Sequence, residues 1–183
     1  PFWVADCISD CVRIHANFST PEARMDFVIY LAKQNIKHQT GGPFAAAVFD
    51  MDTHQLIAVG VNLVVPSNCS INHAEMVALM FAQQTLGSFS LNSKGLPRCE
   101  LVSSCEPCAM CFGAIPWSGI QHVSCGATAA DAEAIGFDEG PKHPLWIEEL
   151  AKRNITVSTE VRHAQAAQVL KDYHAQQGTI YNP

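Results

Sequence analysis

The sequence lacks three features that would each decide its class. No run of apolar residues approaches the roughly 18 that cross a bilayer, so we expect no membrane-spanning helix. No basic segment followed by an apolar one opens the chain, so we expect no secretory signal and a cytoplasmic location. Basic side chains are few, since 11 Lys and Arg stand against 17 Asp and Glu, giving a net charge of −6. Nucleic-acid partners favour a basic surface, so this balance argues against a nucleic-acid substrate.

Internal repeats and low-complexity linkers are also absent, and no boundary between domains is visible. Apolar residues make up 48% of the 183 residues and charged residues 15%, which is typical of a globular chain with a substantial buried core. We therefore expect one domain over residues 1–183.

Hydrophobic periodicity predicts strands that alternate with helices. The expected strands are 43–50, 56–65, 99–105, 120–127 and 155–161. The expected helices are 3–17, 22–37, 73–86, 108–117, 131–136, 145–154 and 162–177. The first two strands are nearly continuous apolar runs, which favour a sheet covered on both faces. The pattern predicts an α/β fold, a three-layer α/β/α sandwich.

The eight cysteines include a group with the spacing of metal ligands. Cys108 and Cys111 are three residues apart, so they share one face of a helical turn, and a helix N-terminus favours their thiolate forms. His73 begins another expected helix and could add an imidazole. Three such ligands leave a fourth position for water, which is typical of catalytic zinc. We expect one Zn²⁺ per chain, with Glu75 as the residue that carries the proton of that water.

Other interpretations of these cysteines remain open. A redox pair would need a thioredoxin-like context and would give His73 and Glu75 no role. A structural zinc site needs a fourth ligand, which Cys105 could supply, and a non-catalytic zinc-binding module would need no Glu75. Glu75 follows His73 by two residues, which on a helix places it on a different face from a metal ligand. Catalytic zinc is therefore favoured.

These residues form the pattern H-x-E…P-C-x-x-C, the signature of zinc-dependent nucleobase deaminases. With the strings GGPFAAAV, NHAEMVAL and SCEPCAMCFGAI, the chain resembles the cytidine-deaminase-like superfamily, in the branch that holds guanine deaminases and tRNA adenosine deaminases. The match runs from about Gly41 to Glu139. The resemblance implies a mixed five-stranded sheet and hydrolytic deamination.

Two features resemble the guanine-specific members of that branch. They are the segment AADAEAIGFDEGP, residues 129–141, and Trp117. The resemblance implies conversion of guanine to xanthine and ammonia, with Glu75 as proton shuttle and Glu139 as second acid. Related proteins often carry aspartate at the position of Glu139, so the glutamate departs from the family pattern and Asp138 is the alternative second acid. The partner would be a small-molecule purine base, with no nucleic acid and no membrane.

The resemblance also implies contacts with the base. Asn62 would hydrogen-bond the purine, Phe44 and Trp117 would stack near it, and the backbone of Ala74 would donate to a ring carbonyl. A homodimer is implied, in which residues 178–183 cover the partner's site and Tyr181 acts as a lid.

Each of these assignments has a plainer alternative. Phe44 could belong to the core, Asn62 could cap a turn, and Trp117 could pack at an interface. Asp138 and Glu139 could be a solvated pair, and the tail could fray. For the function, a tRNA adenosine deaminase or a deaminase of cytosine, a nucleoside or a triazine remains an alternative within the superfamily.

Overall fold

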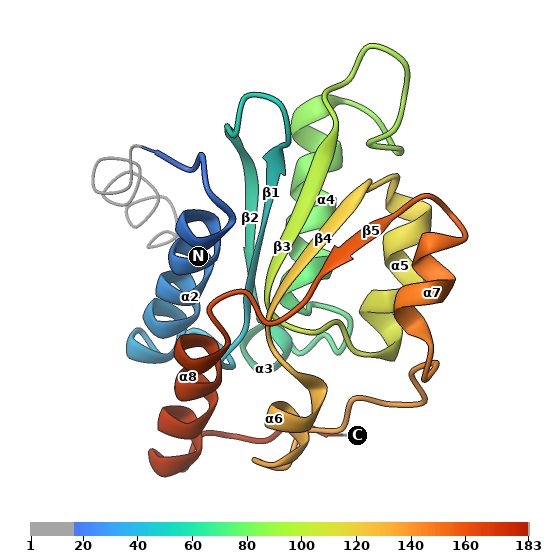
Figure 1. The fold of residues 1–183 in the computed structure, drawn as a ribbon. Coiled ribbons are helices and arrows are strands. Elements are labelled where there is room, and N and C mark those ends of the chain that lie inside the picture. Colours follow the sequence, from blue (N-terminus) through green and yellow to red (C-terminus); the bar gives the residue numbers. More distant parts are fainter. Residues whose placement is uncertain (1–16, 183) are drawn as a thin grey trace.

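A computed structural model describes residues 17–182 and shows one mixed five-stranded sheet (Figure 1). The strands are β1 (Ala45–Asp50), β2 (Leu56–Val61), β3 (Cys99–Cys105), β4 (His122–Ala127) and β5 (Thr156–Ser158). Their order across the sheet is β2-β1-β3-β4-β5. β1 is antiparallel to β2 and β3, whereas β4 is parallel to β3 and β5. The predicted α/β fold with a mixed sheet is confirmed.

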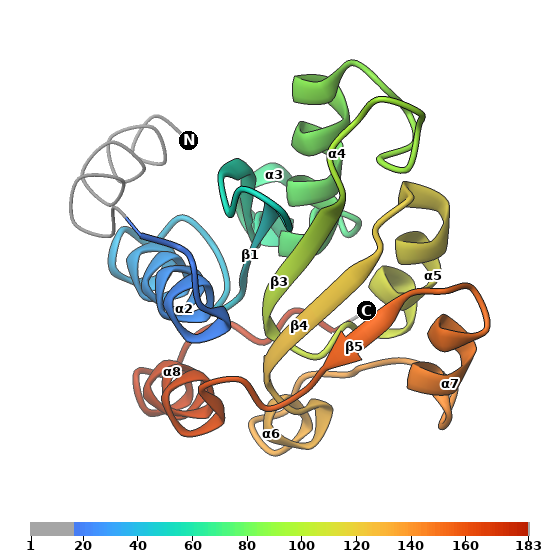
Figure 2. The same cartoon turned by 45° about the horizontal axis from the view of Figure 1, so that its top comes forward.

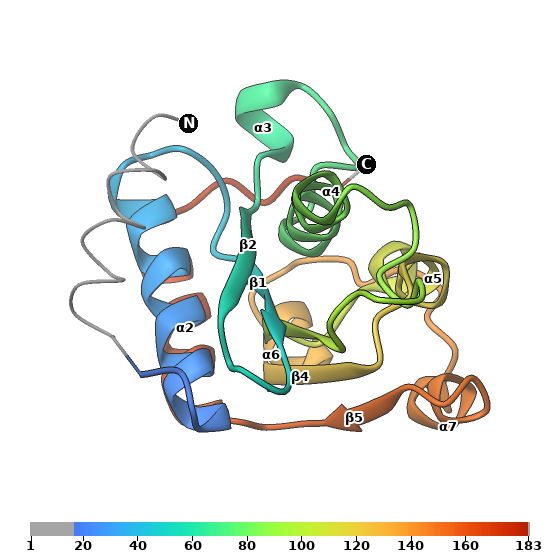
Figure 3. The same ribbon diagram turned by 90° about the horizontal axis from the view of Figure 1, so that it is seen from above.

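Helices form a layer on each face of the sheet, as Figures 2 and 3 show. On one face lie α2 (Pro21–Lys37) and α8 (His163–Ala175). The other face carries α4 (Ala74–Leu86), α5 (Ala109–Ser118) and α7 (Trp146–Ala151). Two short helices, α3 (Val64–Ser67) and α6 (Ala129–Glu133), lie near one end of the sheet. This arrangement is the predicted three-layer α/β/α sandwich.

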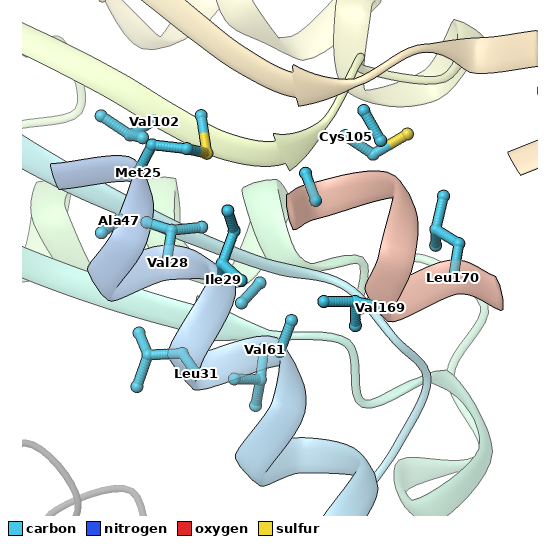
Figure 4. Packing of buried hydrophobic residues seen from close by; sticks show 14 of the residues in the cluster. Met25, Val28, Ile29, Leu31, Ala47, Val61, Val102, Cys105, Val169 and Leu170 are labelled. Carbon is cyan, nitrogen blue, oxygen red and sulfur yellow. The ribbon is translucent and has the colours of Figure 1, made fainter. Parts of the chain in front are cut away.

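Each face of the sheet has its own apolar cluster. Met25, Val28 and Val169 of the first helix layer pack with Val102 of β3 (Figure 4). A second cluster joins β1, β3 and β4 to α4, α5 and α7. Along β1, Ala45, Ala47 and Phe49 face the first cluster, while Ala46 and Val48 face the second. Both faces of β1 are therefore buried, which explains its continuous apolar sequence.

Several element bounds differ from the sequence prediction. The strand expected over 56–65 ends at Val61, because Val61 pairs with Ala45 and β1 begins there. Beyond that pair the chain turns into α3 instead of continuing in the sheet. The helix expected over 3–17 lies outside the described residues. Within residues 17–182, no helix is both long and apolar enough to cross a membrane.

A buried ion pair joins α2 to the sheet. Arg24 Nε lies 2.8 Å from Glu100 Oε2, and the two side chains are only 9% and 3% exposed. Ser124 donates a hydrogen bond of 2.6 Å to the other oxygen of Glu100. The Glu100 carboxylate therefore neutralises the buried guanidinium of Arg24. Loss of this carboxylate would leave the Arg24 charge buried and uncompensated.

We expect Glu100→Gln to lower the free energy of unfolding by about 3–5 kcal/mol, because it removes one partner of this buried pair. Urea unfolding measures the change. The matched control is Asp52→Asn, which breaks an ion pair with Arg98 whose side chains are 58% and 61% exposed. The control should change stability little, since water screens that pair. Equal effects of the two substitutions would contradict the importance of the buried pair.

Candidate active site

A cavity of about 490 Å³ opens at the carboxyl end of β3, between the N-termini of α4 and α5. Most of the residues predicted for the site line it: Phe44, Asn62, His73, Ala74, Glu75, Cys108, Asp138, Glu139 and Tyr181. Its volume lies within the range of small-molecule sites. Residues far apart in the sequence therefore meet in one cleft, hereafter the α4–α5 cleft.

The three predicted metal ligands converge in this cleft. Cys108 Sγ and Cys111 Sγ lie 3.5 and 3.7 Å from His73 Nδ1, and all three ligand atoms lie within 4.8 Å of one another. A tetrahedral zinc ion, with bonds of about 2.0 Å to nitrogen and 2.3 Å to sulfur, holds such atoms about 3.5 Å apart. The donor set and its spacing therefore fit one zinc ion. His73 and Cys108 are the N-caps of α4 and α5, so two positive helix ends face the thiolates.

Cys105 does not complete a closed four-ligand site. Its thiol donates to the carbonyl of Thr128 over 3.4 Å, and it is not part of the ligand group found among the described residues. Burial raises the pKa of Cys105 well above its ordinary value, which keeps the thiol protonated. The alternative of a structural zinc held by Cys105 therefore finds no support in the geometry.

Contacts among the three ligand residues shift the pKa values of their side chains. Contact with the Cys111 thiol and, to a smaller extent, with His73 lowers the pKa of Cys108 to about 4, although burial acts in the opposite direction. The same contact with Cys108 raises the pKa of Cys111, and burial adds to the rise. Burial alone would lower the pKa of His73, but its contact with Cys108 and the charge of Glu75 raise it overall.

Glu75 lies beside the ligand group and is buried. Ser103 of β3 donates to Glu75 Oε1 over 3.3 Å, and the Cys111 thiol donates to Oε2 over 3.4 Å. Burial raises the pKa of this carboxyl. The side chains of His73 and Glu75 reach the same cleft because His73 is an N-cap with extended backbone, rather than a residue of the first helical turn as the sequence suggested.

A second carboxyl, that of Glu139, reaches the cleft from the segment that follows α6. Glu139 is 8% exposed, and its Oε2 is buried without a hydrogen-bond partner within residues 17–182. Burial raises its pKa to about 8, and the negative charge of Cys108 contributes to the rise. Asp138 also lines the cleft but is exposed, and its Oδ1 accepts a hydrogen bond from the Gly140 amide. Of the two candidate acids, Glu139 is the one with a buried carboxyl.

Polar and aromatic groups also line the cleft. Asn62 is buried, and its Oδ1 accepts from the Val64 amide over 3.3 Å, which orients its Nδ2 as a donor. The Ala74 amide is the first of α4 and has no acceptor within the helix. Phe44 is half-buried, and the buried Tyr181 hydroxyl has no hydrogen-bond partner in the described part of the chain. Such groups can fix the edge and face of a flat polar ring.

Comparison with known families agrees with this geometry. The model of the cytidine and deoxycytidylate deaminase zinc-binding region matches residues 19–127, which include His73, Glu75, Cys108 and Cys111. The chain belongs to this deaminase family. The deaminase is therefore a zinc-dependent aminohydrolase, and its cofactor is Zn²⁺.

Relatives within the family include named purine enzymes. A solved structure described as guanine deaminase from Nitrosomonas europaea is 51% identical, covers 85% of each chain and superposes with a TM-score of 0.84. NE0047 in complex with 2,6-diaminopurine is also 51% identical, with a TM-score of 0.86 over 90% of this chain and 86% of that one. Guanine deaminase from Bacillus subtilis (strain 168) is 38% identical over 111 residues, which are 61% of this chain and 67% of that protein.

Trp117 does not belong to the α4–α5 cleft of this deaminase. Its side chain is 87% exposed, and it borders a separate surface pocket with Phe112 and Arg153. Nine residues separate it from Cys108, which places it about 13 Å farther along α5. The expectation that Trp117 stacks on a base bound in this cleft is therefore corrected.

The deaminase also places residues in the cleft that the sequence did not single out. Phe137 is buried and packs edge-on against Phe44 and Tyr181, with ring centroids 5.0 Å apart in each pair. Asn182 lines the cleft from the C-terminal tail. Neither residue has a spacing or chemistry that marks it in the sequence. Phe137 could have been noticed only as an apolar residue two positions before the expected acid.

Proposed function

We propose that this deaminase hydrolyses guanine to xanthine and ammonia. The observation that supports this substrate is its similarity to guanine deaminases along most of the chain, in particular at 51% identity. The cleft adds chemical support, because two buried carboxyls, Glu75 and Glu139, face one cavity of a size that suits a single base. The net charge of −6 makes a tRNA substrate less suitable.

In the proposed mechanism, His73, Cys108 and Cys111 hold one zinc ion. Zinc bound there would supply a water molecule acidic enough to act as nucleophile at neutral pH. Glu75 accepts the proton of this water and passes it to ring N3 as the water oxygen bonds to C2. Ser103 and the N-terminal turn of α4 keep the carboxyl of Glu75 in place for both transfers.

The exocyclic amine must gain a proton before it leaves as ammonia. Glu75 or Glu139 donates it as the C2–N bond breaks, and the carboxyl that donates regains a proton from the hydroxyl group now on C2. The burial that raises the pKa of Glu139 keeps a proton on that carboxyl at neutral pH. Two carboxyls suit this reaction because protons must reach two different atoms, N3 and the amine nitrogen. Water and guanine are thereby converted to xanthine and ammonia.

We assign recognition of the base to groups around the two carboxyls. The Asn62 carboxamide and the Ala74 amide donate to acceptors on the purine edge, while Phe44 packs on its face and Tyr181 closes the cleft. A site built from buried polar groups rejects a ring that leaves them unpaired, so adenine should react poorly. In the described chain, Tyr181 and Asn182 of the tail line the cleft of their own chain. Exchange of the tail in a homodimer stays a prediction. A single domain over residues 1–183 and a cytoplasmic location also stay predictions.

The substrate is tested by ammonia release from the zinc-loaded protein with guanine, guanosine, adenine, cytosine, cytidine and tRNA. We expect rapid release from guanine, with xanthine formed in equal amount. Release from cytosine or tRNA in place of guanine would overturn the substrate assignment while retaining the deaminase chemistry. A zinc-loaded protein inactive on every compound would contradict the proposed reaction itself.

A further inference from the structure

The position of Glu139 depends on its backbone, because its own carboxyl is held weakly. Glu139 Oε2 has no hydrogen-bond partner among the described residues. Its carbonyl accepts from the Ala109 amide over 2.9 Å, which fixes the C-terminal side of the residue to the start of α5. What holds the N-terminal side therefore determines where this carboxyl points.

On that side, the Phe137 amide donates to the Ala132 carbonyl over 3.2 Å, and a side chain from the end of the chain adds two further hydrogen bonds. Asn182 Nδ2 donates to the carbonyl of Gly136 over 2.7 Å, and Asn182 Oδ1 accepts from the amide of Asp138 over 3.0 Å. One carboxamide thus binds the backbone on both sides of Phe137, as a neighbouring strand would. Asp138 directly precedes Glu139, so the second bond lies one residue from the acid.

The tail that carries Asn182 is itself anchored. Tyr173 of α8 donates to the Thr179 carbonyl over 2.7 Å, and the Gly178 amide donates to the Tyr173 carbonyl over 3.0 Å. Figure 1 shows this segment running from α8 across the lower end of the molecule toward α6. Asn182 therefore reaches the acid-bearing segment from a fixed direction.

Aromatic packing and a glycine complete the anchoring. Tyr181 packs against Phe137, the residue between the two hydrogen bonds of Asn182. A Cβ added to Gly42 would lie 2.5 Å from the Tyr181 hydroxyl. The absence of a side chain at position 42 therefore leaves room for the Tyr181 ring. Phe137 also stacks with Tyr173, at 6.3 Å between ring centroids. Tail and segment 136–138 thus form one packed unit.

We propose that Asn182 is a positioning residue that directs the Glu139 carboxyl into the α4–α5 cleft. It contacts the backbone beside Glu139, so it acts through that acid and not as a catalytic group. The inference rests on the proposed role of Glu139 in deaminating guanine. It assigns the last described residue of the chain to the reaction through a defined pair of hydrogen bonds, separately from any contact of Tyr181 with the base.

The test is a double-mutant cycle between Asn182→Ala and Glu139→Gln. Small misplacement of a reacting group can cost about 10²-fold in rate, so we expect Asn182→Ala to lower kcat by roughly 10–100-fold with little change in KM. In the Glu139→Gln background, Asn182→Ala should change kcat by less than about 2-fold, because residues that act as a unit are not additive. Thr179→Ala, in the same tail and without a side-chain hydrogen bond in the structure, is the matched control and should behave as wild type.

Asn182→Asp separates the two hydrogen bonds. A carboxylate still accepts from the Asp138 amide but cannot donate to the Gly136 carbonyl, so we expect a loss of kcat similar to that of Asn182→Ala. Unchanged kcat in both Asn182 variants would overturn the proposal. An equal loss from Asn182→Ala in the wild-type and Glu139→Gln backgrounds would also overturn it, because Asn182 would then act independently of the acid.

Hydrogen exchange of the Asp138 amide gives a readout that needs no turnover. We expect this amide to be protected in the wild type and in Thr179→Ala, and to exchange at least 10-fold faster in Asn182→Ala. If guanine proved not to be a substrate, this difference would still support the two hydrogen bonds of Asn182 to segment 136–138, while the proposed function failed. Equal exchange in all three proteins would show that Asn182 does not hold this segment, even if guanine were deaminated.

Discussion

Glu75→Gln is expected to abolish turnover of guanine while leaving one zinc ion per chain. Glutamine has the shape of glutamate and can keep the hydrogen bond from Ser103, but it cannot accept the proton of the attacking water. General acid–base catalysis contributes about 10²–10⁴-fold, and Glu75 serves more than one transfer, so we expect kcat to fall by roughly 10³-fold or more. Steady-state kinetics and metal analysis of the purified variant measure the two effects.

The control for this variant is Glu133→Gln, which removes a carboxylate from the exposed part of α6. It should leave both kcat and zinc content unchanged. Activity of Glu75→Gln within 10-fold of the wild type would refute the shuttle role. Loss of zinc from Glu75→Gln would show instead that the carboxyl supports the metal site.

Cys111→Ser should release zinc and with it the activity. The three ligands are the minimum for a catalytic zinc site, and Cys111 is completely buried beside His73. Loss of a group that merely supports a ligand weakens metal binding about 10–100-fold, so loss of a ligand itself should weaken it further. A competition titration with a zinc-binding dye measures the affinity.

Cys69→Ser is the matched control, because Cys69 is a free cysteine outside the ligand group of the described chain. It should bind zinc as tightly as the wild type does. If Cys111→Ser kept wild-type zinc affinity, the ligand assignment would be wrong. If Cys111→Ser lost zinc but retained full activity, the catalytic role of the metal would be wrong.

The metal ligands and Glu75 could be predicted from the sequence because each sits at the start of a helix with a local spacing. His73 and Cys108 are the N-caps of α4 and α5, so the local sequence that starts each helix also places the side chain of its N-cap residue. The apolar runs of β1 and β3 predicted their bounds closely for the same reason, since burial on both faces leaves a continuous pattern.

The remaining site residues depend on contacts that no local pattern encodes. The resemblance of one segment suggested both Glu139 and Asp138, and only the fold shows which carboxyl is buried. Trp117 was misplaced because family resemblance gave it a role, while its distance along α5 carries it out of the cleft. Asn182 was missed because its partners lie 44 and 46 residues away in the sequence.

The most direct test of a zinc-dependent guanine deaminase is the rate of xanthine formation as zinc is returned to metal-free protein. With saturating guanine, we expect the rate to rise in proportion to added zinc and to reach a plateau at one zinc ion per chain, matching the one ligand group, His73, Cys108 and Cys111, found within residues 17–182. A rate that is independent of zinc, or no xanthine at one bound zinc ion per chain, would contradict the proposal.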